Sequence, residues 1–114
     1  MITCTLDQLI TVHSVLISLS RQRIVAAQAF TLNNMLQQCS MYVDQCKQIN
    51  RQSTWLVVHG YKSLEKHKAD MNDLRNQVVD LLGPQLDLGK INPLVVSDLS
   101  SSEKEALRPF SLKV

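Results

Sequence analysis

The sequence predicts an all-α protein, either a long antiparallel helical hairpin or a small three-helix bundle with coiled-coil character, followed by a loosely structured C-terminal tail. Apolar residues recur at helical spacing over most of the first 82 residues, and the 114-residue chain has only three glycines and three prolines. Sandwiches and barrels need many tight turns, so this composition disfavours them. We expect a helical part over residues 1–84 and a tail over residues 85–114.

The first predicted helix begins at a capping box. Thr5 and Gln8 have the T-x-x-Q spacing in which each side chain satisfies a backbone N–H of the other residue. Apolar residues then follow at steps of three and four, which is one face of a helix; they are Leu9, Val12, Leu16 and Leu19, with Ala26 and Phe30 extending the row. We expect this helix over residues 6–49, continuous or kinked. A break near residue 31 is the alternative, because Thr31 can cap a new helix.

A second apolar row is the predicted partner-binding surface. Its members stand at steps of 3, 4, 3, 4 and 3: Leu32, Met35, Cys39, Tyr42, Cys46 and Ile49. This is the a/d pattern of a coiled coil, whose seam packs against another helix. The row does not share the register of the first one. Trp55 is added to this surface, where it either plugs the end of the hairpin or stands exposed as an anchor for a partner.

The second helix is predicted over residues 55–82, after a polar turn at residues 50–54. Its apolar row comprises Val57, Tyr61, Leu64, Met71, Leu74, Val78 and Leu81. Gly60 is expected inside this helix. Gly83 and Pro84 are expected to end it, because glycine adopts the left-handed cap and proline prevents continuation. The two helices would be about 66 and 42 Å long. A lone hairpin of this length cannot hide both faces, so the longer helix is expected to fold back on itself or to pair with another chain.

The tail changes character and offers one short helix. In "SSSEKEAL", Ser100 or Ser102 stands three residues ahead of Glu103 or Glu105, which is capping-box spacing. Pro109 is expected to end this helix. The apolar residues of the tail either pack onto the hairpin or stay mobile until a partner binds; they are Leu86, Leu88, Val95, Val96 and Phe110.

The sequence contains no motif that specifies a reaction. No serine or cysteine has a paired base at a recognisable spacing, and the chain has no C-x-x-C pair and no glycine-rich phosphate loop. We therefore expect a non-enzymatic protein without a metal or a cofactor. Cys39 and Cys46 lie about 10 Å apart along a helix, too far to bond to each other. They are expected to be structural thiols; the alternative is a thiol switch, whose oligomer size would respond to a reducing agent.

The predicted function is protein–protein interaction, as a small helical adaptor, chaperone or assembly subunit that buries its apolar stripe against a partner or a second copy. We expect self-association as a homodimer. The alternative is a small regulator that binds nucleic acid through Lys62, Lys66 and Lys68, although a net charge of +2 gives it little support.

The predicted location is the cytoplasm. Three cysteines without a disulfide framework indicate a reducing compartment. The first ten residues contain no basic residue, unlike a secretory signal. The early run "LITVHSVLISL" is too short and too polar to span a bilayer, so no membrane span is expected.

Overall fold

The structure is a computed structural model that describes residues 2–21, 26–91 and 93–111. Within these residues the elements, in chain order, are β1 (Ile2–Thr5), α1 (Leu6–Ser20), α2 (Ala26–Val58), α3 (Leu64–Arg75), β2 (Val78–Leu81), α4 (Pro93–Ser97) and α5 (Ser101–Leu107), with 3₁₀ turns at Leu88–Lys90 and Arg108–Phe110. The prediction of a mostly helical protein is confirmed. The small sheet was not predicted.

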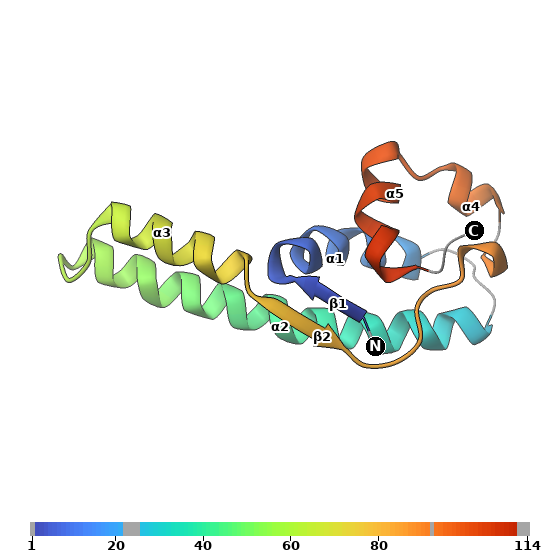
Figure 1. Cartoon of the computed structure of the whole chain (residues 1–114), viewed down its shortest axis with the longest axis horizontal. Coiled ribbons are helices and arrows are strands. Elements are labelled where there is room, and N and C mark those ends of the chain that lie inside the picture. Colours follow the sequence, from blue (N-terminus) through green and yellow to red (C-terminus); the bar gives the residue numbers. More distant parts are fainter. Residues whose placement is uncertain (1, 22–25, 92, 112–114) are drawn as a thin grey trace.

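The long helix α2 organises the molecule (Figure 1). Its first half carries a head made of β1, α1, β2, α4 and α5. Its second half projects from this head and is accompanied only by α3. We call residues 46–75 the arm. The predicted hairpin of helices over residues 6–49 and 55–82 does not form; a shorter antiparallel pair, α2 with α3, lies at one end of α2 instead.

The predicted start of α1 is confirmed, whereas its predicted end is wrong. Thr5 Oγ1 accepts a hydrogen bond from the backbone N–H of Gln8 at 3.2 Å, and Gln8 Oε1 accepts from the N–H of Thr5 at 2.9 Å. The helix ends at Ser20, and α2, which begins at Ala26, passes through Thr31 without a break. The two apolar rows differ in register because they belong to two helices that face each other across one core.

The hydrophobic core lies between α1 and the first half of α2. Both helices contribute their apolar rows to it: Leu9, Val12, Leu16 and Leu19 from α1, and Leu32, Met35, Cys39 and Val43 from α2. Strand residues Ile2, Cys4 and Leu81 close one side. Phe30, which the sequence placed on the row of α1, is 83% exposed because it belongs to α2 and points away from this core.

Residues 78–81, predicted as helix, form strand β2 instead. β2 runs antiparallel to β1, with Ile2 opposite Leu81. The Gln38 side chain then holds the end of the strand: its Oε1 accepts from the N–H of Leu82 at 2.8 Å and its Nε2 donates to the Leu82 carbonyl at 2.7 Å. Gly83 has φ +108°, and a Cβ there would lie 2.5 Å from Asn34 Nδ2. This glycine therefore serves a turn after a strand, not the end of a helix.

The chain reverses at residues 59–63, not at the predicted turn 50–54. Gly60 has φ +76° in this reversal, so it does not lie inside a helix. Residues 50–54 continue α2, and all of them except Ser53 are exposed. Their polarity therefore reflects a helix surrounded by water, which a sequence pattern cannot distinguish from a turn.

The C-terminal segment packs on the head. α5 begins with the capping box that Ser100 and Glu103 were predicted to form. Leu86, Leu107 and Phe110 are each fully buried, and Val95 is partly buried against the core. Of the two alternatives for the apolar residues of the tail, the structure shows packing for these side chains.

We predict that Phe110→Ala destabilises the protein by about 3 to 5 kcal/mol, because it empties a large buried site. Phe30→Ala is the matched control, since the Phe30 ring is 83% exposed and its removal should change stability by no more than about 0.5 kcal/mol. Urea unfolding followed by circular dichroism measures both. Equal losses from the two variants would show that the C-terminal segment leaves the head in solution.

Candidate functional site

The predicted partner-binding seam is mostly buried within the chain itself. Leu32, Met35, Cys39 and Cys46 are at most 9% exposed, and Tyr42 is half-buried. α1 folds back over this face of α2 and occupies the position that we expected a partner to take. In this fold the first five members of the seam therefore build the core or its edge. Ile49 and Trp55 remain open to solvent, with 42% and 53% exposure.

The arm leaves many apolar side chains uncovered. α3 lies along only one side of α2 and buries none of its own residues fully. Six large apolar side chains of the arm are exposed: Ile49, Trp55, Leu56, Val58, Tyr61 and Leu64. Apolar groups that gather on one exposed part of a protein typically mark an interaction site.

Aromatic rings at the end of the arm are ordered by stacking. The Trp55 ring lies on the His59 ring, with centroids 3.9 Å apart, and the Tyr61 ring follows at 6.1 Å from Trp55. His59 Nδ1 also lies 2.9 Å from the Trp55 carbonyl oxygen. Rings that are already ordered lose little conformational entropy when they bind, so this cluster is suited to contact with another molecule.

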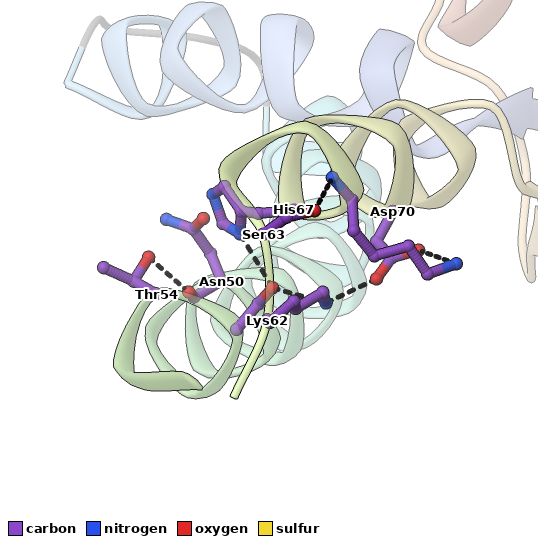
Figure 2. Close-up of polar contacts among 8 residues, drawn as sticks. Asn50, Thr54, Lys62, Ser63, His67 and Asp70 are labelled. Atoms are coloured by element: carbon purple, nitrogen blue, oxygen red, sulfur yellow. Dashed lines mark hydrogen bonds and ion pairs between the residues drawn. The ribbon is translucent and has the colours of Figure 1, made fainter. Parts of the chain in front are cut away.

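A polar network connects α3 to α2 (Figure 2). Lys62 Nζ donates to Ser53 Oγ at 2.7 Å, and the same hydroxyl lies 2.7 Å from His67 Nδ1. Because an ammonium group can only donate, the Ser53 oxygen accepts from Lys62, and which of Ser53 and His67 donates to the other depends on the tautomer of the ring. Lys62 also pairs with Asp70. The network therefore links α2, the reversal and α3 into one rigid unit.

Asp70 holds two of the three lysines in the predicted basic face. It pairs with Lys62 and, at 3.2 Å, with Lys66. The hydrogen bonds from Lys62 and then Lys66 lower the pKa of the Asp70 carboxyl, so the carboxylate stays ionised near neutral pH. Of these three lysines, Lys68 alone is exposed and forms no ion pair with another described residue. The structure thus gives less support to nucleic-acid binding than the sequence did.

The contact between Ser53 and His67 resembles a nucleophile beside a base, but its surroundings suit a structural role. Ser53 is only 5% exposed, and its hydroxyl is shared with the Lys62 ammonium. Neither Ser53 nor His67 lines the shallow pocket beside Trp55 or the one between α2 and α3 that Cys46, Asn50 and Met71 line. We therefore assign the pair to the stability of the arm.

The three cysteines are free thiols in buried positions. Burial raises the pKa of Cys39 to about 12 and also raises those of Cys4 and Cys46. The thiolate is the reactive form, so these thiols react slowly near neutral pH. Residues 2–21, 26–91 and 93–111 contain no cluster of metal-binding side chains.

Sequence reasoning missed a second stripe on α2. Met41, Gln48 and Trp55 follow each other at seven-residue intervals, as do Ile49 and Leu56. Met41 is 52% exposed, on the side of α2 opposite the buried row. Near the end of this stripe Arg51, Gln52, Trp55 and Leu56 line a shallow pocket. The heptad spacing was a signal for this surface, but the stronger row at Leu32–Ile49 concealed it.

Comparison with protein-family models, with curated proteins and with solved structures found no match for this chain. Among the helices that the structure describes, none has the length and hydrophobicity needed to cross a bilayer.

We predict that Ser53→Ala loosens the arm by about 1 to 3 kcal/mol, because Lys62 and His67 lose their shared partner in a partly buried site. Thr54→Ala is the matched control, since the exposed Thr54 hydroxyl donates only to the Asn50 carbonyl of its own helix. Limited trypsin digestion should cut after Lys62 and Lys66 faster in Ser53→Ala alone. Equal cleavage in both variants and the parent would contradict a structural role for the network.

Proposed function

We propose that this protein works by non-enzymatic protein–protein binding and that the arm is its docking surface. The observation that carries the proposal is the contrast between the two parts of the molecule. The head closes its own core, and the 30-residue arm carries six of the eleven large apolar side chains that are exposed in the described residues, Trp55 and Leu56 among them. A side chain such as Trp55 contributes most when it is buried against a partner, and tryptophan is enriched among residues that dominate binding energy.

The construction of the arm supports this proposal. The network around Ser53 and the stacked rings hold the surface in place before binding, which lowers the entropic cost of association. A rigid helix that presents apolar side chains suits pairing with a helix of another protein. Such a protein would act as a small adaptor, chaperone or assembly subunit, and its three free thiols fit a reducing compartment such as the cytoplasm.

This proposal narrows the surface that the sequence predicted. Ile49 and Trp55 stay in it, Leu56 and Tyr61 join it, and Met41, five residues before the arm, extends it along α2. Leu32, Met35 and Cys39 leave it, because they are buried in the core of the head. Nucleic-acid binding through Lys68 and its neighbours would be favoured instead by a steep loss of affinity for DNA or RNA with rising salt.

Site-specific photo-crosslinking tests the proposal. A benzophenone amino acid placed at the exposed Gln52 on the arm should form an adduct with protein in cells of the source organism. The matched control places it at the exposed Lys104 on α5. We expect protein adducts from position 52 only, with a reduced yield after Trp55→Ala. Equal adducts at both positions, no protein adduct at position 52, or a nuclease-sensitive adduct there would contradict docking of a protein on the arm.

A further inference from the structure

The outer face of α2 carries matching features on either side of Gln48. Met41 stands seven residues before Gln48 and Trp55 seven residues after it, so all three point to the same side of the helix. Both Met41 and Trp55 are about half exposed, at 52% and 53%. The helix therefore presents two apolar anchors at equal distances from one central residue.

The two anchors have different surroundings. A shallow pocket on this face is lined by Arg51, Gln52, Trp55 and Leu56. Met41 presents a half-exposed, flexible and apolar side chain, a type that adapts well to irregular apolar sites. A Met41 side chain from another molecule is therefore suited to fill the pocket beside Trp55.

The charges beside the anchors are complementary as well. Asp44 stands three residues after Met41, and Arg51 stands four residues before Trp55. Both side chains are exposed, and neither forms an ion pair within the part of the chain that the structure describes. They are seven residues apart, so they flank the stripe on the same side.

We propose that the outer face of α2, from Met41 in the middle of the helix to Trp55 in the arm, binds a second copy of this chain, with the two α2 helices antiparallel and crossing near Gln48. This inference rests on the proposed function and names its partner. Met41 of one copy then enters the pocket beside Trp55 of the other. Asp44 lies about 6 Å from the crossing and Arg51 about 4.5 Å from it, so each carboxylate reaches the guanidinium of the other copy. The two-fold axis produces every contact twice.

The antiparallel arrangement is favoured over the parallel one by charge. Residues 47–68 contain five basic residues and one acidic residue. A parallel pair would place these segments side by side and would put Arg51 against its own copy, whereas the antiparallel pair places them at opposite ends. Figure 1 shows that α1, α3, α4 and α5 lie on one side of α2, whereas β2 and the chain after it cross α2, where Asn34 and Gln38 hold Leu82. The side of the second half of α2 that faces away from α3 carries no other helix or strand of the described residues.

A charge exchange tests this pairing. Sedimentation equilibrium measures the dissociation constant of the unmodified protein, of Asp44→Arg, of Arg51→Asp and of the double variant. We expect a dimer that each single variant weakens about tenfold or more and that the double variant restores, because it exchanges the two partners. Both positions are exposed, and circular dichroism checks that each variant stays folded. Single variants that dimerise as well as the parent, or a double variant that adds their losses, would overturn the inference.

Cysteine pairing tests the orientation. Gln45 and Gln52 lie at nearly equal distances on either side of the crossing, so a mixture of Gln45→Cys and Gln52→Cys chains should form a mixed disulfide-linked dimer. Gln45→Cys alone should link poorly, because its two copies lie about 9 Å apart along the axis. Efficient linking of Gln45→Cys to itself would overturn the antiparallel arrangement.

The outcomes for the two proposals can be told apart. A chain that stays monomeric at all accessible concentrations, yet gives an adduct with a different protein from position 52, overturns the second copy as the partner and leaves the docking function standing. An adduct of twice the chain's mass supports both. Absence of any protein adduct together with a monomer overturns both.

Discussion

The packing of α1 against the first half of α2 is the contact on which the rest of the structure depends. α1 has 15 residues and α2 has 33, which gives them lengths of about 22 and 50 Å. α1 can therefore cover only part of its neighbour. The strands and the C-terminal segment complete the core around that part, and the remaining length of α2 is left to the short, polar α3. The exposed apolar surface of the arm follows directly from this difference in length.

The sequence predicted helical periodicity and caps well, because both are local. The capping boxes at Thr5 and Ser100 form as expected, and the row from Leu32 to Cys46 is indeed a helix-packing seam. The spacing predicts that this face packs against another helix, but it does not identify that helix. α1 of the same chain packs on this face, so the seam that was expected between molecules forms a core within one molecule.

Features that depend on distant residues could not be predicted. Strand β2 pairs with β1 across more than 70 residues, and its "VVDL" segment fits a helical row equally well. The arm network needs the reversal at Gly60 to bring Lys62 and His67 to Ser53. For the candidate site the sequence identified Ile49 and Trp55, but it missed Met41 and Leu56. Their exposure becomes visible only once the buried side of α2 is known.

Native-state hydrogen exchange of a dilute sample tests the division of α2 most directly. The account predicts that backbone amides from Leu32 to Val43 exchange only through global unfolding, together with those of α1, because they belong to one core. Amides of α2 beyond Cys46 should exchange through a separate opening of lower free energy, because α3 alone covers them. Uniform protection along the whole of α2 would contradict the claim that a closed head and an independent arm share this helix.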